Sequence, residues 1–470
     1  MKKLFKPLAL AMCLIMLFAF SGCGKAKTTS EVSSDSGLLD FDNETVSGKN
    51  NGSGTVSGND TNVSSGAGTK VEEPVKINEN DPFSNIPKRL KGTTVKFAHF
   101  GDEGASEYQK VAKAFTKKTS IKVEFVSFAQ AEYEAQVAKQ INAGLAPDVV
   151  ICNGMFPSCL AIMQPLNGIM DVNSSFWDKN TTKATTVGGK TYAVNSLKGP
   201  WMNADALIYN KQIFSNNGVK TPADYVKEGT WSWENYKKCL EDVVKAGKYG
   251  GRLDGTQMAI SMGQPIISYD ASSNTFKSNL DAAATYLQYE AQCVKDGLYP
   301  TSEWWGTFAN GNTGMYPAGT YGLKYNGYLK NAEDNILAAI VMPTSYKGTK
   351  CKPSGSLRAY GIAKGAKNPE GAVYFLRYFL DYSYYSDAKA NVFKNKSLEK
   401  FYFDTLMPQI EKDGIIFDYS ENVYLQNGKT LGELLGTLNE PAQVSTQVAS
   451  IKNVVENTVK KCNETVAKYK

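Results

Sequence analysis

This chain has almost no histidine and no pair of cysteines at the close spacing of metal-binding motifs. Its 470 residues include one histidine, His99, and no Cys-x-x-Cys pair. Structural zinc sites and most transition-metal sites need several such ligands, so we expect no metal and no cofactor. The Gly-x-Ser-x-Gly turn of hydrolases is missing, and "NGKT" (427–430) lacks the upstream glycine of a phosphate-binding loop. We therefore predict no catalytic residues, although paired carboxylates of a glycosidase remain open from sequence.

Long runs of basic or apolar residues are also missing after the N-terminus. The net charge is +6, from 52 Lys and Arg against 46 Asp and Glu. No basic cluster with interleaved aromatics appears in the part expected to fold, which argues against nucleic acid as a partner. No second apolar stretch reaches the length of a membrane span.

The N-terminus has the pattern of an export signal. Three early lysines precede an uncharged apolar stretch from Pro7 to Phe20, and Ser21-Gly22 then lead to Cys23. This stretch resembles the lipobox of bacterial lipoproteins, with Phe20 where Leu is usual. The resemblance implies that residues 1–22 are a signal peptide and that Cys23 carries lipid. It places the protein on the outer face of a Gram-positive-type cell membrane. A plain signal peptide with an incidental cysteine is the alternative.

A low-complexity segment follows Cys23. Residues 24–80 are rich in Ser, Gly, Asn, Thr and acidic residues, and Thr-Val-Ser-Gly occurs at 45–48 and again at 55–58. Such a composition does not bury enough apolar surface to fold. We therefore predict that residues 23–80 form a lipidated, flexible tether.

The sequence does not predict how the remaining cysteines pair. Six are left once Cys13 leaves with the signal peptide and Cys23 takes lipid, and six cysteines allow fifteen pairings. Cys239 shares a helical face with Tyr236, Leu240 and Val243, which favours a buried apolar role.

The folded part begins with alternating strand and helix patterns. We predict strands at 94–100, 121–128 and 147–152 and helices at 106–118 and 131–144 from their hydrophobic periodicity. This order predicts a doubly wound α/β fold with a mostly parallel sheet.

Ligands of such sheets bind at the carboxyl ends of the strands. The loops "GDEG" (101–104) and "NGMFP" (153–157) are predicted at that edge, so Asp102 and Glu103 are candidate acceptors for ligand hydroxyl groups. Solvated acidic residues are the alternative interpretation.

Four stretches together carry a family resemblance over about residues 94–380. They are "LAPDVVIC", "TYAVNSLKGPWMNADALIYNKQIFSNNGVKTPADY", "FANGNTGMYPAGTYG" and "YGIAKGAKNPEGAVYFLRYFL". In order and spacing they resemble the extracellular solute-binding proteins of bacterial sugar importers, which include the maltose-binding proteins. Gly314 stands where the family often has Ala, and Tyr321 where it often has Trp.

The resemblance implies two α/β lobes joined by hinge strands. Lobe 1 is predicted at 81–200 and 356–395, and lobe 2 at 201–355 and 396–470. The chain is expected to cross between the lobes near 193–201, 354–361 and 387–396.

The implied function is capture of a carbohydrate by lobe closure and delivery to the permease of an ABC importer. The ligand is expected to be an oligosaccharide, and the protein a monomeric binding protein rather than an enzyme. Two alternatives stay open: a cell-surface carbohydrate-active enzyme, and a binding lipoprotein for a non-sugar solute such as a peptide.

Sugars need flat aromatic rings for their apolar faces and fixed polar groups for their hydroxyls. Trp201 lies at a predicted crossing, and Tyr321 matches a family position that stacks on sugar. Trp304 and Trp305 adjoin, so only one of them is expected to face the ligand. Arg358 is a further candidate, with a structural ion pair as its alternative role. Trp201 has packing at the hinge as its alternative.

Trp231 and Trp233 are predicted to pack in the core. They flank Ser232, a residue suited to cap a helix that starts there.

Overall fold

The computed structural model describes the chain from Glu73 to Lys470, with short gaps. The predicted signal peptide, Cys23 and the tether up to residue 72 lie outside the described residues. The described residues are 73–100, 105–129, 132–154, 156–252, 255–299, 308, 310–319, 323, 336–393 and 395–470.

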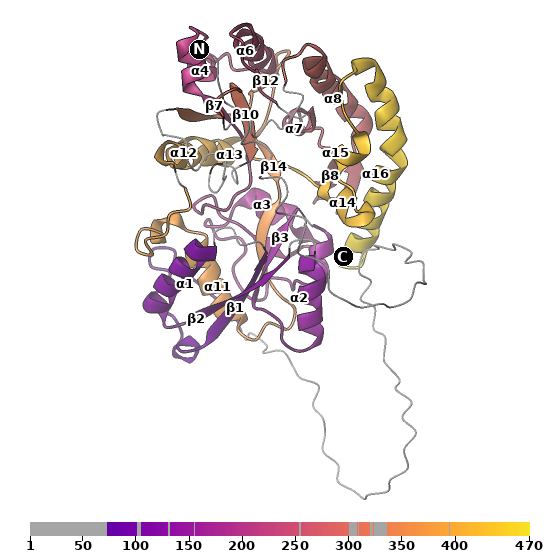
Figure 1. The fold of residues 1–470 in the computed structure, drawn as a ribbon. Helices are drawn as coiled ribbons and strands as arrows, with labels where there is room; N and C mark the ends of the chain where they lie inside the picture. Colours follow the sequence, from indigo (N-terminus) through magenta and orange to yellow (C-terminus); the bar gives the residue numbers. More distant parts are fainter. Residues whose placement is uncertain are drawn as a thin grey trace, which may run out of the picture. The chain divides into compact units, whose positions relative to one another are not determined.

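A five-stranded sheet forms the base of the first lobe among these residues (Figure 1). Its strands, in spatial order, are β2 (Lys122–Phe128), β1 (Thr94–Phe100), β3 (Val149–Asn153), β15 (Arg358–Ile362) and β6 (Ala193–Val194). Helices α1 (Ala105–Thr119), α2 (Tyr133–Asn142) and α11 (Pro369–Phe379) pack on it, and α3 (Lys179–Ala184) contacts β6. The predicted β-α-β-α-β order is confirmed.

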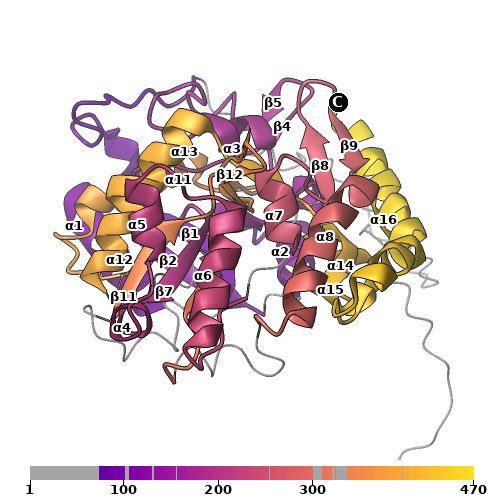
Figure 2. The same ribbon diagram turned by 90° about the horizontal axis from the view of Figure 1, so that it is seen from above.

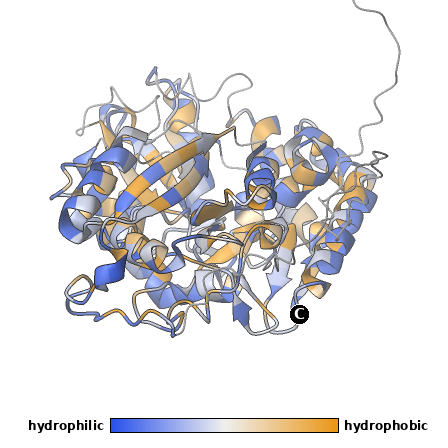
Figure 3. Ribbon diagram, turned by 90° about the horizontal axis from the view of Figure 1, so that it is seen from below, coloured by the Kyte–Doolittle hydropathy of each residue, from blue (hydrophilic) through white to orange (hydrophobic). Residues whose placement is uncertain are grey.

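The sequence periodicity explains the first of these elements. Val95 and Phe97 of β1 are buried, as are Val111 and Phe115 on the predicted stripe of α1. Each element therefore turns its apolar side into the core. Figure 3 shows the result, with hydrophobic and hydrophilic residues alternating on the strands and on the helices.

Two side chains join β1 to β3. The Tyr133 hydroxyl donates to the carbonyl of Ala98 (2.9 Å) and accepts from the amide of Ile151 (2.8 Å). The Asp148 carboxylate accepts from the amides of Lys96 and Asn368, at 2.8 and 2.7 Å. Burial raises the pKa of Asp148 and these hydrogen bonds lower it. β3 is thus joined to its surroundings just before its amino end, at Asp148, and in its middle, at Ile151.

The second lobe is built on an antiparallel sheet of β10 (Met315–Gly319), β7 (Asp205–Asn210) and β11 (Leu337–Val341) among the described residues. Its hairpins are β8 (Ile267–Asp270) with β9 (Thr275–Ser278) and β12 (Ser345–Tyr346) with β13 (Thr349–Lys350). Figure 2 shows α6, α7 and α8 next to one another, and α8 packs on α16. The helices of this part are α4 (Lys211–Asn216), α5 (Pro222–Lys227), α6 (Trp233–Lys245), α7 (Gly255–Ser261), α8 (Leu280–Lys295), α12 (Lys396–Phe401), α13 (Met407–Asp413), α14 (Glu421–Asn427), α15 (Leu431–Leu435) and α16 (Val444–Ala467).

Strand direction agrees with the prediction of a mostly parallel sheet in the first lobe, where β1, β2, β3 and β6 run the same way. It differs from the prediction in the described sheet of the second lobe, which is antiparallel. In the first sheet, β1 runs parallel to β2 and β3, whereas β15 runs antiparallel to β3 and β6. The register explains this, because Arg358 at the start of β15 lies opposite Asn153 at the end of β3. A strand that enters the sheet from the second lobe, at the edge where β3 ends, must run back along β3.

The start of α6, next to Trp231 and Trp233, agrees with the prediction from the sequence. Ser232 caps α6, and its hydroxyl accepts from the amide of Asn235 at 3.2 Å. Trp231 and Trp233 are both buried, which confirms their predicted packing role. Cys239 is also buried on this helix, with Tyr236, Leu240 and Val243.

The chain segment before the first strand contacts the folded lobe. Val75 pairs with Met170, and its amide donates to the carbonyl of Ile169 at 2.7 Å. Glu79 lies 3.6 Å from Arg377, a guanidinium that is 4% exposed and also binds Asp381. Residues 75–80, which the sequence assigned to the tether, therefore make specific contacts with the lobe.

We predict that a chain beginning at Asp81 is less stable than one beginning at Glu73. It loses the hydrogen bond of Val75, the burial of Val75 and Ile77, and the Glu79 contact, together worth roughly 1–3 kcal/mol. Thermal unfolding checks this. The chain beginning at Cys23 is the control, and it should have the same melting temperature as the chain beginning at Glu73. Equal melting temperatures for the Asp81 and Glu73 chains would show that the segment adds no stability.

Candidate functional site

The chain crosses between the two lobes in segments that pack directly on one another. Residues 195–204 connect β6 to β7, and the chain returns from β14 (Ser354–Ser356) to β15. The Asn195 amide nitrogen donates to the carbonyls of Arg358 (2.8 Å) and Trp201 (3.3 Å). One side chain thus ties both crossings together.

The two crossings approach too closely for a side chain at Gly355. A Cβ atom there would overlap the carbonyl oxygen of Asn203. Next to it, the Ser354 hydroxyl donates to the Asp205 carboxylate at 2.7 Å, at the start of β7. Glycine is therefore required at this point of the hinge.

Trp201 is packed within the first lobe. It is 1% exposed, and its indole ring stacks on Phe379 with 5.3 Å between ring centroids. Its Nε1 donates to the Tyr385 hydroxyl at 2.8 Å, and Tyr108 meets the ring edge-on at 5.1 Å. In this structure the neighbouring side chains cover the predicted stacking ring.

Arg358 lies against the same ring. Its guanidinium carbon is 5.4 Å from the Trp201 centroid, a cation–π arrangement. Its Nε donates to the Tyr360 hydroxyl at 3.1 Å and Nη2 to that of Tyr108 at 3.4 Å. Arg358 is partly exposed, so a positive charge is fixed at the edge of the sheet where β3 ends.

The structure therefore brings together two of the predicted site residues, Trp201 and Arg358. The other five lie outside the described residues; they are Asp102, Glu103, Trp304, Trp305 and Tyr321.

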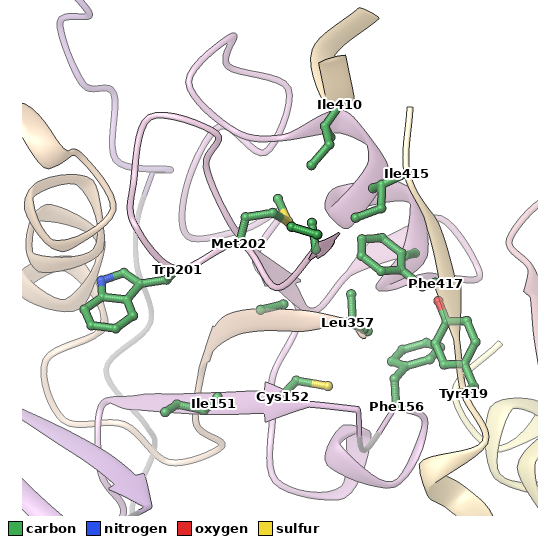
Figure 4. Packing of buried hydrophobic residues seen from close by; sticks show 14 of the residues in the cluster. Ile151, Cys152, Phe156, Trp201, Met202, Leu357, Ile410, Ile415, Phe417 and Tyr419 are labelled. Carbon is green, nitrogen blue, oxygen red and sulfur yellow. The ribbon is translucent and has the colours of Figure 1, made fainter. Parts of the chain in front are cut away.

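A second contact between the lobes forms at the loop after β3. The Phe156 ring lies 5.1, 6.0 and 6.2 Å from those of Tyr269, Phe276 and Tyr419. The Asn422 amide nitrogen, at the start of α14, donates to the carbonyl of Phe156 at 2.9 Å. Figure 4 shows Phe156 beside Tyr419, with Trp201 apart from both. The lobes thus touch at the hinge and at this loop.

A half-buried carboxyl group supports the loop from the first lobe. Glu134 of α2 accepts a hydrogen bond from the Ser158 hydroxyl at 2.8 Å. Burial raises the pKa of Glu134 to about 7, and the Ser158 hydrogen bond lowers it. At neutral pH, the Glu134 carboxyl is therefore protonated in a fraction of the molecules.

Phe156 and Asn422 were not predicted as functional residues. The sequence placed Phe156 in a loop at the ligand edge, but its partners in lobe 2 are more than a hundred residues away. Asn422 carries no sequence signal, because its role depends on where α14 packs. Tyr385, which holds Trp201, likewise follows from no local pattern.

The described residues offer no group of three His, Cys, Asp or Glu side chains placed to hold a metal ion. Within the same part of the chain, no helix combines the length and apolar character needed to cross a bilayer.

Comparison with known structures identifies the fold. An ABC substrate-binding protein from Listeria monocytogenes in complex with cycloalternan aligns with 80% of this chain and 99% of its own, at 18% identity and a TM-score of 0.52. A cyclic α-maltosyl-1,6-maltose binding protein from Arthrobacter globiformis aligns with 80% of this chain and 99% of its own, at 16% identity and a TM-score of 0.56. A solute-binding protein from Thermotoga lettingae bound to α-D-tagatose aligns with 79% of this chain and 100% of its own, at 16% identity and a TM-score of 0.55. These likenesses confirm the two-lobe α/β fold.

No curated protein sequence shows a significant match to the chain. Residues 100–384 match the profile of a family described as bacterial extracellular solute-binding protein. The match covers more than half of the chain and includes Trp201 and Arg358 at the hinge. The chain therefore belongs to the bacterial extracellular solute-binding protein family.

Proposed function

We propose that this protein captures a carbohydrate, an oligosaccharide in the first instance, and delivers it to an ABC importer without chemical conversion. The family match over residues 100–384 carries this proposal. Structural relatives whose names include cycloalternan, cyclic maltosyl-maltose and tagatose support carbohydrate as the ligand class. The protein acts as a monomer, and the permease subunits are its protein partners.

Lobe closure is the proposed binding mechanism. Hinge motion needs a few residues between rigid bodies, and residues 195–204 and 354–358 occupy that position. A ligand shifts such an equilibrium only by contacts that differ between the two states. In this proposal the hydrogen bond from Asn422 to Phe156 forms only in the closed state, where it adds a contact between the lobes to those made by the ligand.

The proposed ligand site is the edge of the first sheet near Arg358. The guanidinium is held there by the hydroxyls of Tyr360 and Tyr108, and its N–H groups are of the donor type that hydroxyl oxygens accept from. Asp102, Glu103, Tyr321 and one of Trp304 and Trp305 complete the site in this proposal. Trp201 supports the Arg358 guanidinium through the cation–π contact in this proposal.

We further propose that Cys23 carries the lipid anchor and that the tether holds the lobes away from the membrane. The sequence from Pro7 to Cys23 supports this arrangement. Two lipid chains on one cysteine give stable membrane binding, which one chain does not. The predicted lobe limits, 81–200 with 356–395 and 201–355 with 396–470, belong to the same proposal.

A thermal-shift screen tests the ligand class. The mature chain is heated with maltose, maltotetraose, cycloalternan, tagatose or a peptide mixture, and we expect an oligosaccharide to raise the melting temperature. Incubated sugars are then analysed for cleavage, and unchanged sugars separate a binding protein from an enzyme. A shift only with peptides would contradict the carbohydrate assignment.

With the sugar from this screen, Tyr321→Ala should weaken binding by roughly 1.5–3 kcal/mol, about tenfold or more in dissociation constant. Trp201→Ala should instead cost about 3–5 kcal/mol of unfolding free energy, because its ring fills the core beside Phe379. Calorimetric titration and melting curves separate the two effects. Unchanged affinity for Tyr321→Ala would remove that residue from the site.

Removal of the lobe–lobe hydrogen bond tests closure. Asn422→Ala should weaken sugar binding by about 2–10-fold, the scale of one net hydrogen bond, although Asn422 is not placed at the ligand. Asn427→Ala is the matched control on the same helix, since its amide bonds the carbonyl of Val423 within α14. Equal affinities for the two variants would argue against closure through this contact.

Cys23→Ser should abolish lipid attachment. The expected result is a chain released into the medium or held as an uncleaved precursor, since the thiol is the acceptor of the diacylglyceryl group. Metabolic labelling with a radioactive fatty acid measures this directly. Label that persists in Cys23→Ser would place the lipid elsewhere.

A further inference from the structure

Two of the six cysteines outside the N-terminal region lie next to each other. The sulfur atoms of Cys152, in β3, and Cys159, in the short helix Ser158–Ala161, are 2.6 Å apart. Both side chains are at most 1% exposed. The thiols of Cys239 and Cys351 approach other groups instead, namely the carbonyl of Lys220 and the sulfur of Met262. A disulfide bond is about 2.05 Å long, so only the first pair is close to bonding distance among these contacts.

The backbone holds this pair together without a crosslink. The amide of Gly154 donates to the carbonyl of Leu357 at 2.7 Å, and the positive φ of Gly154 (69°) turns the chain at the end of β3. The Ser158 hydroxyl then binds Glu134, which fixes the return of the loop. Figure 4 shows Cys152 on β3, close to the point where the chain turns toward Phe156.

We propose that Cys152 and Cys159 form a disulfide bond in the exported protein, and that this bond closes the loop that carries Phe156 to the second lobe. Disulfides form in oxidising compartments, and the family is extracellular. The two cysteines are thus a site of covalent modification, and this proposal does not depend on which ligand the protein binds.

The bond forms by exchange with a disulfide oxidant, either a protein disulfide or a small-molecule disulfide. One cysteine thiolate attacks the oxidant and forms a mixed disulfide, and the second displaces the remaining oxidant sulfur. Two protons and two electrons leave the pair, and the oxidant is reduced to two thiols.

The burial of the two thiols determines the stage of folding at which this exchange takes place. The pKa of the Cys159 thiol lies well above its usual range, because burial disfavours the thiolate and Cys152 lies beside it. Exchange needs a thiolate and access, so it is fast before the loop packs and slow afterwards. The bond therefore forms during folding and, once formed, resists reductants that act on the native protein.

Thiol trapping of the exported protein tests the proposal without any variant. Cells are treated with N-ethylmaleimide before lysis, the protein is denatured without reductant, and its peptides are mapped by mass spectrometry. We expect a peptide with a bond between Cys152 and Cys159, two hydrogen atoms lighter than the dithiol, with Cys239, Cys293, Cys351 and Cys462 alkylated. Alkylation of both Cys152 and Cys159, or a bond to any other cysteine, would overturn the proposal.

A variant comparison measures what the bond does. Dithiothreitol added under denaturing conditions, followed by refolding in its presence, should lower the melting temperature of the unaltered chain by several degrees. The Cys159→Ser chain should melt at that lower temperature with or without reductant. Cys462→Ser, a buried thiol on α16, is the matched control and should stay sensitive to the reductant. Equal melting of the oxidised and reduced unaltered chain would show that the bond does not brace the loop.

Discussion

The rest of this structure depends on one constraint: the two segments of the chain that cross between the lobes pack directly on one another. The Asn195 amide holds the carbonyls of Trp201 and Arg358, and Gly355 leaves room for the backbone of Asn203. These few contacts fix where each lobe begins. They also place Arg358 at the end of β3, the edge at which ligands of α/β sheets bind.

A second consequence of this geometry is the contact at the loop after β3. The loop leaves the same edge of the sheet, packs Phe156 among the aromatic rings of the second lobe, and accepts a hydrogen bond from Asn422. In the proposed closure of the lobes, the crossings are the pivot and the loop is the contact surface. The Glu134 carboxyl and the Cys152–Cys159 pair both support this loop from the side of the first lobe.

The sequence predicted the features that depend on local periodicity. The strands and helices between residues 94 and 153 were predicted within a few residues, because each buries a regular stripe such as Val95 and Phe97. The cap of α6 at Ser232 followed from one residue type at one position. The two-lobe architecture came from the family resemblance, since no periodicity in one segment indicates a partner elsewhere in the chain.

Features that depend on distant contacts were missed for the same reason. The sequence placed Trp201 at a hinge, but its burial depends on Phe379 and Tyr385, which lie far along the chain. Val75 was assigned to a flexible tether, because a single apolar residue in a polar segment gives no signal of its pairing with Met170. Likewise, the spacing of Cys152 and Cys159 does not single out this pair, because six cysteines allow fifteen complete pairings.

Small-angle X-ray scattering of the mature chain, with and without the sugar that stabilises it, tests the central claim most directly. Capture by lobe closure predicts that saturating sugar decreases the radius of gyration of the monomer, and that the free chain regains its larger value when the sugar is removed. An unchanged radius of gyration at a sugar concentration that saturates binding would contradict closure between the two lobes.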